Sequence, residues 1–234
     1  MAGAAARSVL SLERAAFAEH LTSNLPVLLD LELRSSEINM VYVADEADGS
    51  TMIDLCLGYV PPPSGRVRFL GLDWAGCSRL ERLRRRRRIG MVAQTEVWPS
   101  EMTVMEAVLL PQLYHFDNRR EELVTEATLL ARLFELPGLP AERRDLMSRE
   151  ALLRAGCVRG FFGSPELVIV LDRLLDQTPE LAAPMAQAIA AVVGRGGAVM
   201  WITTAPGSQS AQFVEANQVL RLGTTGLIPM RRRR

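Results

Sequence analysis

Residues 37–58, EINMVYVADEADGSTMIDLCLG, decide the predicted fold of this chain. An apolar run predicts a buried strand over Ile38–Val43, and the residues that follow predict a helix that begins near Gly49. A tight loop joins the two segments. A buried strand, a tight loop and a helix in this order are the layout in which proteins build a phosphate-binding P-loop.

The residues that give a P-loop its chemistry are missing from this stretch. A working P-loop reads G-x-x-x-x-G-K-S/T, where the glycines let backbone N–H groups surround the phosphates and the lysine neutralises them. Here the two glycine positions hold Val43 and Asp48, the lysine position holds Gly49, and only Ser50 and Thr51 remain. The chain contains no lysine, since all 27 of its basic residues are arginine. The sequence therefore predicts the layout of a nucleotide site without its phosphate-binding groups.

Acidic residues stand where the glycines and the lysine are expected. Asp45, Glu46 and Asp48 all lie in the predicted loop. One pair of like charges about 4 Å apart costs about 4 kcal/mol at an effective dielectric constant of about 20, so these acids oppose phosphate binding. Asp48 also precedes the predicted start of the helix, where its carboxylate is expected to accept backbone N–H bonds as an N-cap. We therefore expect Asp48 to occupy the anion position that a phosphate fills in a P-loop.

Composition limits the classes of protein to consider. The chain has 234 residues, is 48% hydrophobic and carries a formal net charge of zero, which fits one sizeable core and gives no overall field that attracts nucleic acid. No apolar run approaches the roughly 20 residues of a membrane span, and charges interrupt the N-terminus too often for a signal peptide. Cys56, Cys77 and Cys157 have no metal-ligand spacing, so we expect reduced, buried thiols in a cytoplasmic protein and no metal site.

Alternating strands and helices predict an α/β fold with a mainly parallel sheet, of the P-loop NTPase-like (RecA-like) class. Two early strands predict an N-terminal antiparallel β layer, and a helical subdomain is predicted as an insertion between two halves of the sheet. The predicted core spans residues 1–95 and 160–234, and the helical subdomain spans residues 96–159. The expected strands are residues 8–14, 27–33, 38–43, 66–70, 89–93, 166–171 and 198–203, and a closing hairpin is expected at 219–222 and 226–229. The expected helices lie in residues 103–134, 148–162 and 179–193. Pro111, Pro137 and Pro140 divide the first of these helical regions.

Taken in order, these segments resemble the ATP-binding subunit of ABC transporters over nearly the whole chain. Pro-Ser-Gly-Arg-Val at residues 63–67 resembles that family's turn after the first helix, and Ile-Gly-Met-Val-Ala-Gln at 89–94 resembles its Q-loop. Met-Thr-Val-Met-Glu-Ala-Val at 102–108, followed by Pro111, resembles a further family segment. The sequence Glu-Ala-Val-Leu-Leu-Pro at 106–111 is similar to the corresponding segment of subunits that handle lipids and lipoproteins.

The resemblance also shows which family positions have changed. The L-S-G-G-Q signature falls on Met-Ser-Arg-Glu-Ala at 147–151, so that Ser148 is retained and both glycines are lost. The switch histidine position holds Thr204. Two alignments of the Walker B strand are open: one puts the metal-binding aspartate at Leu171 and the catalytic glutamate at Asp172, and the other puts them at Asp172 and Arg173. We favour the first, because Pro165 and residues 179–181 both support it.

The resemblance implies a catalytically impaired ATPase-like subunit with no catalytic residue of its own. We expect it to dock to a membrane permease, to an active ATP-binding partner, or to both, on the cytoplasmic side of the inner membrane. It would pair either with an active ATP-binding subunit, as a heterodimer, or with itself, as a homodimer. No resident cofactor is expected, and ATP with magnesium would bind only through the family's retained positions. These positions are Ser50, Thr51, Gln94 and Ser148. Gln94, Trp98 and Tyr114 are candidates for the permease interface, although both aromatic residues fit a core role equally well.

Two further interpretations remain open at this stage. The chain can be an adaptor or regulator that uses the fold to bind another protein, or a residual nucleotide enzyme in which Arg149 or Arg173 replaces the lysine, since arginine binds phosphate well. The arginine run 84–88 predicts a solvated helix face, with contact to phospholipid headgroups as the alternative. The same alternative applies to the tail at residues 231–234, which is otherwise expected to be disordered.

Overall fold

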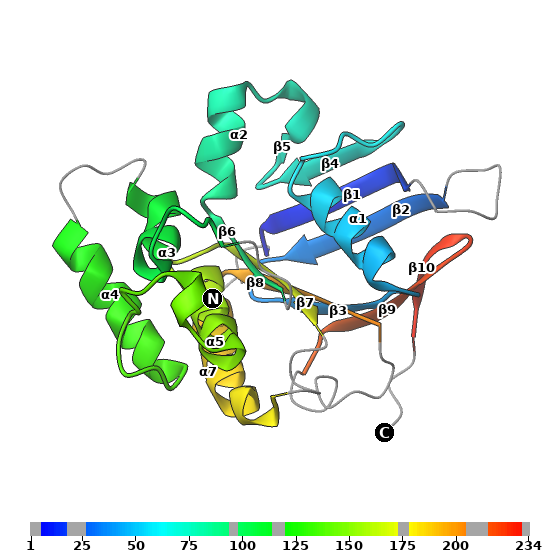
Figure 1. Cartoon of the computed structure of the whole chain (residues 1–234). Helices are drawn as coiled ribbons and strands as arrows, with labels where there is room; N and C mark the ends of the chain where they lie inside the picture. The colour runs from blue at the N-terminus through cyan, green and yellow to red at the C-terminus, as the bar shows by residue number, and fades with distance from the viewer. Residues whose placement is uncertain are drawn as a thin grey trace, which may run out of the picture.

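The structure is a computed structural model, and it describes residues 6–17, 27–93, 98–113, 120–172, 178–204 and 215–230. Its described part consists of two β-sheets and the helices that pack on them (Figure 1). No helix in these ranges is long and apolar enough to cross a membrane. All three cysteines are free thiols; Cys56 and Cys157 are buried, as predicted, whereas Cys77 is half-buried.

The smaller sheet has four antiparallel strands in the order β2-β1-β4-β5. It consists of β1 (Ser8–Phe17), β2 (Val27–Arg34), β4 (Arg66–Phe69) and β5 (Leu72–Asp73). Buried and exposed residues alternate along β2, because one face of an antiparallel sheet packs on the core and the other meets solvent. The sheet confirms the predicted N-terminal antiparallel layer.

The larger sheet has six strands in the order β10-β9-β3-β8-β7-β6, and only β10 runs antiparallel to its neighbour. It consists of β3 (Ile38–Tyr42), β6 (Ile89–Ala93), β7 (Leu167–Asp172), β8 (Ala198–Thr203), β9 (Gln218–Gly223) and β10 (Gly226–Pro229). Every residue of β8 is buried, as expected for a central parallel strand covered on both faces. The mainly parallel sheet and the closing hairpin are both confirmed.

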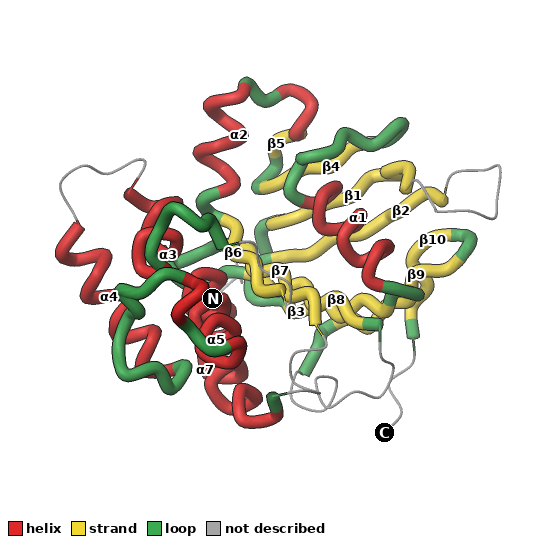
Figure 2. Tube along the Cα trace, viewed as in Figure 1, coloured by secondary structure: helices red, strands yellow, loops and turns green. Residues whose placement is uncertain are grey.

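Helices cover the two faces of the larger sheet differently (Figure 2). One face packs against α3 (Val104–Leu113), α4 (Arg120–Leu133), α5 (Arg149–Phe161) and α7 (Ala182–Gly194). On the other face, α1 (Glu46–Cys56) lies between the two sheets and contacts strands of both. The short helix α2 (Arg79–Arg86) stands at the edge of the molecule beside β6, and single 3-10 turns occur at Trp74–Gly76, Arg144–Leu146 and Pro179–Leu181.

A close backbone crossing joins α5 to β6. A Cβ atom at Gly90 of β6 would lie only 1.7 Å from the carbonyl oxygen of Gly160 on α5, so neither sheet nor helix tolerates a side chain at Gly90. The approach places the helices of residues 98–161 and the sheet in one continuous core, in which Val92 and Trp201 of the sheet meet Phe134 and Phe161 of the helices. The predicted boundary of a separate helical subdomain at residues 96–159 stays a prediction.

Two of the predicted helix limits are wrong. Pro111 does not end a helix, because α3 continues through it to Leu113. α7 begins at Ala182 rather than Pro179, since Pro179–Leu181 forms a 3-10 turn at which proline is tolerated in the first position. The predicted start of the first helix is also wrong, and that difference changes the candidate site.

Candidate functional site

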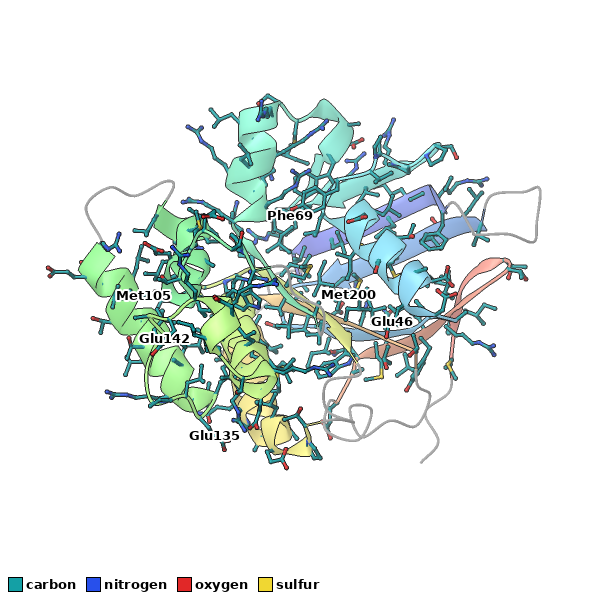
Figure 3. All side chains as sticks on the ribbon, in the orientation of Figure 1. Glu46, Phe69, Met105, Glu135, Glu142 and Met200 are labelled. Carbon is teal, nitrogen blue, oxygen red and sulfur yellow. The ribbon has the colours of Figure 1, made fainter. Side chains whose placement is uncertain are left out.

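The candidate site lies where the carboxyl ends of β3, β7 and β8 meet the first turn of α1. Ligands of open α/β folds bind at this edge of the sheet. The three strands run parallel, and Val43 continues the ladder beyond β3 by donating its N–H to the Thr203 carbonyl at 3.0 Å. Figure 3 marks the site by Glu46, at the beginning of α1.

The P-loop segment is wound into helix in this protein. α1 begins at Glu46, three residues before the predicted start at Gly49, and its N-cap is Asp45. Oδ1 of Asp45 accepts the N–H of Asp48 at 2.9 Å, and the Asp45 carbonyl accepts the N–H of Gly49 at 3.3 Å. The prediction that Asp48 caps the helix is therefore wrong: Asp48 is a residue of the first turn, and its own N–H is held by the true cap.

The sequence explains why the helix starts early. The family's glycines, which keep a P-loop open, are replaced by Val43 and Asp48. Asp45 is a favoured N-cap residue, and the acidic first turn with Glu46 and Asp48 interacts favourably with the positive end of the helix dipole. The Asp48 and Gly49 N–H groups therefore bond to Asp45, which leaves neither of them directed at a phosphate.

An apolar contact occupies the place of the lysine. Gly49 is buried, and a Cβ atom built on it would lie 2.6 Å from Cδ1 of Leu171, 3.5 Å from Cγ2 of Ile202 and 3.7 Å from Cγ2 of Val43. Leu171 is the residue that the favoured alignment places at the metal-binding aspartate. The structure thus brings together two positions that the family fills with opposite charges, and joins them by hydrocarbon packing.

The retained hydroxyl residues belong to helix starts. Ser50 is exposed on α1, and Oγ1 of Thr51 donates to the Ala47 carbonyl at 2.8 Å. Ser148 is the N-cap of α5, where its Oγ accepts the N–H of Ala151 at 3.1 Å. Local hydrogen bonding accounts for Thr51 and Ser148, and their role toward a nucleotide stays a prediction.

The remaining predicted site residues are only partly described. Thr204 follows β8 at the candidate site, and Arg149 is an exposed first residue of α5. Trp98 is buried in the helical core, with the Arg159 guanidinium 4.3 Å from its ring centre. This burial matches the core alternative for Trp98, and an interface role stays a prediction. Gln94, Tyr114 and Arg173 lie outside the described residues, as does the side chain of Asp172.

The described residues do not fit ATP with magnesium in the manner of a P-loop. The site offers acids at the helix start and an apolar contact at its centre, and no group of potential metal ligands occurs in the described part of the chain. The sequence analysis named Asp45 and Leu171 but missed the cap role of Asp45 and the contact of Leu171 with Gly49. The spacing Asp45-x-x-Asp48 was the available signal for an earlier cap, whereas the Gly49–Leu171 contact joins residues far apart in the chain.

Solved structures identify the fold. The chain superposes on an ATP-binding subunit of an ABC transporter with a TM-score of 0.74 and 16% identity, over 94% of this chain and 88% of that one. It matches the dimeric ATP-binding cassette MJ0796, in a state bound to ADP and Pi, with a TM-score of 0.74 and 15% identity, over 94% of this chain and 96% of that one. The fold is therefore that of an ABC ATPase cassette.

Sequence relatives point to the same group of proteins. The chain is 25% identical over 200 residues to the phosphonates import ATP-binding protein PhnC 2 of Synechococcus sp. (strain JA-2-3B'a(2-13)), covering 82% of this chain and 74% of the relative. It is 29% identical over 162 residues to PhnC 1 of Pseudomonas savastanoi pv. phaseolicola, covering 66% and 61%. It is 26% identical over 177 residues to the lipoprotein-releasing system protein LolD of Ruegeria sp. (strain TM1040), covering 75% and 78%. No family model matches the chain. By sequence and fold, the chain is related to the ATP-binding subunits of ABC transporters.

Proposed function

We propose that this chain is a noncatalytic subunit of an ABC transport complex. In this role it docks to a membrane permease and pairs with an active ATP-binding subunit, on the cytoplasmic side of the membrane, and does not itself bind or hydrolyse ATP. The observation that carries the proposal is the contact between Gly49 and Leu171, which fills the centre of the former phosphate site with hydrocarbon.

Electrostatics at the start of α1 supports the loss of nucleotide binding. Phosphoryl transfer relies on positioning and on positive groups that stabilise spread negative charge. Here Asp45, Glu46 and Asp48 bring negative charge to the position of the phosphates, and the chain contains no lysine to offset it. A single like-charge pair near 4 Å costs about 4 kcal/mol at an effective dielectric constant of about 20, which is about a thousandfold in affinity.

The paired change at Gly49 and Leu171 supports the same conclusion. A lysine at Gly49 needs the space that the Leu171 side chain holds, because Cδ1 of Leu171 lies 2.6 Å from the first side-chain atom. A charged ammonium group buried against leucine carries a large desolvation penalty. We therefore expect a lysine at residue 49 to be accommodated better when Leu171 is changed as well.

The parts of the chain away from the phosphate site support the role of a complex subunit. Thr103 and Glu106 form a reciprocal cap at the start of α3, with the Thr103 N–H donating to Glu106 at 2.9 Å and the Glu106 N–H donating to Thr103 Oγ1 at 3.2 Å. This cap keeps the 102–108 segment, which resembles the family, in a defined helical form. The named relatives serve phosphonate import and lipoprotein release, so they fit a transport role without selecting a cargo.

Equilibrium binding of a labelled ATP analogue with magnesium to the purified chain tests the proposal. A known ABC ATPase serves as the positive control. We expect no binding by the wild-type chain up to millimolar nucleotide. Micromolar binding by the wild-type chain overturns the proposal and directs attention to the arginine that has replaced the lysine.

Two variants make the test specific to the apolar contact. The double variant Gly49→Lys/Leu171→Asp restores both charged positions, and the single variant Gly49→Lys is its matched control. We expect neither the wild type nor the single variant to bind, and we expect any recovered binding only in the double variant. Equal binding by the single and double variants contradicts the role that we give to Leu171.

A further inference from the structure

Helix α2 turns its polar and apolar sides the opposite way from an ordinary surface helix. Amphipathic helices of globular proteins bury an apolar stripe and expose charged residues. None of the residues of α2 is buried, yet Leu80 is 50% exposed and Leu83 is 39% exposed. Neither leucine is a member of the two hydrophobic cores of the described chain. The apolar residues of α2 therefore face outward.

The arginines of this helix hold it to the body of the protein. Arg82, Arg85 and Arg86 all donate to backbone carbonyl groups, which belong to the end of α1, to β4 and to the 3-10 turn at Trp74. The bonds join Arg82 Nε to the Trp74 carbonyl (3.2 Å), Arg85 Nη1 to the Phe69 carbonyl (3.3 Å), and Arg86 Nε and Nη2 to the Leu57 and Gly58 carbonyls (2.9 and 2.7 Å). The Arg86 guanidinium also lies 4.1 Å from the centre of the Tyr59 ring. The prediction of a solvated arginine run over residues 84–88 is therefore wrong for Arg85 and Arg86.

These hydrogen bonds fix the arginines without cancelling their charge. A carbonyl group is neutral, whereas a carboxylate partner would neutralise the guanidinium. Within this segment, Arg88 forms a salt bridge with Glu166. Residues 79–88 contain seven arginines and one glutamate, a local formal charge of +6 in a chain whose total is zero. The glutamate, Glu81, caps the helix by accepting the N–H of Ser78 at 2.7 Å.

Two leucines and two arginines form one exposed surface on α2. Arg79, Leu80, Leu83 and Arg84 are all exposed. Leu80 and Leu83 are three residues apart, and the pairs Arg79–Leu83 and Leu80–Arg84 are four apart, which places all four on one side of a helix. We call these four residues the α2 outer face. In Figure 1, α2 projects from the top of the molecule, beyond the strands of both sheets.

We propose that the α2 outer face docks on an anionic lipid bilayer. Clustered arginines attract acidic headgroups and bind their phosphates through paired N–H donors, and neighbouring leucines enter the boundary between headgroups and acyl chains. A helix that projects from the body of the protein can reach a flat bilayer, which supplies both acidic headgroups for the arginines and an apolar layer for the leucines. The proposal goes beyond the proposed function, because it concerns a direct lipid contact of this chain and does not depend on a permease or on the nucleotide position.

Sedimentation of the full chain with lipid vesicles tests the proposal. The probes are vesicles of phosphatidylcholine alone and vesicles that also contain phosphatidylglycerol. We expect binding only to the anionic vesicles, with weaker binding at high salt, since salt screens exposed charges. Replacing two arginines in Arg79→Gln/Arg84→Gln is expected to weaken binding about 25-fold, at roughly 1 kcal/mol for each arginine near the surface. Leu80→Gln/Leu83→Gln is expected to weaken it as well.

Matched variants separate this surface from other causes. Leu129→Gln/Arg132→Gln removes an exposed leucine and an exposed arginine from α4, and it is expected to bind as the wild type does. A chain with residues 231–234 changed to glutamine is expected to keep most of its binding, which excludes the arginine tail as the main cause. Because no residue of α2 is buried, its variants are expected to keep the wild-type circular dichroism spectrum.

Three outcomes overturn the lipid assignment. They are equal binding to neutral and anionic vesicles, no vesicle binding by the wild type, and unchanged binding in both α2 double variants. If vesicles fail to bind but the same α2 variants release a co-purified acidic protein, the surface recognises a protein and the lipid proposal is wrong. None of these results bears on ATP binding, so the two proposals fail separately.

Discussion

The contact between Gly49 and Leu171 predicts a measurable coupling between the two residues. Alanine is favoured over glycine inside a helix by about 1 kcal/mol, so Gly49→Ala would stabilise α1 if space allowed. In the wild type, the new Cβ atom meets Leu171 Cδ1 at 2.6 Å, and such overpacking costs about 1–3 kcal/mol. We expect Gly49→Ala to lower the free energy of unfolding by up to about 2 kcal/mol.

Removing Leu171 should reverse the sign of this effect. In a Leu171→Ala background the obstructing atom is gone, and Gly49→Ala is then expected to raise the free energy of unfolding by about 1 kcal/mol. The coupling energy between the two substitutions is therefore expected to be about 1–3 kcal/mol. Urea unfolding of the wild type, both single variants and the double variant measures it.

A second glycine provides the control for this cycle. Gly194 ends α7, and a Cβ atom there meets nothing within 4 Å. Gly194→Ala should have the same effect with Leu171 present or absent. Additivity of Gly49→Ala and Leu171→Ala within about 0.5 kcal/mol would refute the reasoning, because the contact would then not decide which side chain Gly49 tolerates.

Three other predictions concern stability. Asp45→Ala removes the cap of α1 and should lower the free energy of unfolding by about 1 kcal/mol in urea denaturation, whereas Asp45→Asn should retain most of it. Burial alone would raise the pKa of Glu166, but hydrogen bonds from Arg88 and Arg7 outweigh it and hold the pKa below its ordinary value of 4.5. This stabilisation is fully present above pH 4.5 and is lost as the pH falls through the lowered pKa. Glu166→Gln should therefore lower the free energy of unfolding at neutral pH by about 1 kcal/mol after screening. The difference in free energy of unfolding between the variant and the wild type should be smallest in acid. Arg154→Met breaks hydrogen bonds to the Phe134 carbonyl (3.0 Å) and to two exposed carboxylates. It should lower the melting temperature more than Glu135→Gln, which removes only one of those partners. Equal decreases in melting temperature for the two variants would contradict this prediction.

Much of the architecture follows from local sequence patterns. The runs at 166–171 and 198–203, apolar except for Glu166 and Thr203, predicted central strands, and β7 and β8 lie there within one residue. A strand that is covered on both faces has few positions that favour polar residues, so its near-continuous apolar run can be recognised in the sequence. Helix limits were harder to predict. Pro111 suggested a break, but α3 continues through it, and the cap of α1 was misplaced by three residues because several acids compete for that role.

The absence of the lysine and glycines of a P-loop is evident from the sequence alone, because the residue at each position can be read without coordinates. The sequence also showed the cluster of arginines at 79–88, since charge is a property of composition. The contacts that these residues make became visible only in the folded chain. Leu171 meets Gly49 across 122 positions of the chain, and the α2 arginines turn toward carbonyls while the leucines face out. Such contacts depend on how strands and helices pack, and a pattern of neighbouring residues does not contain that information.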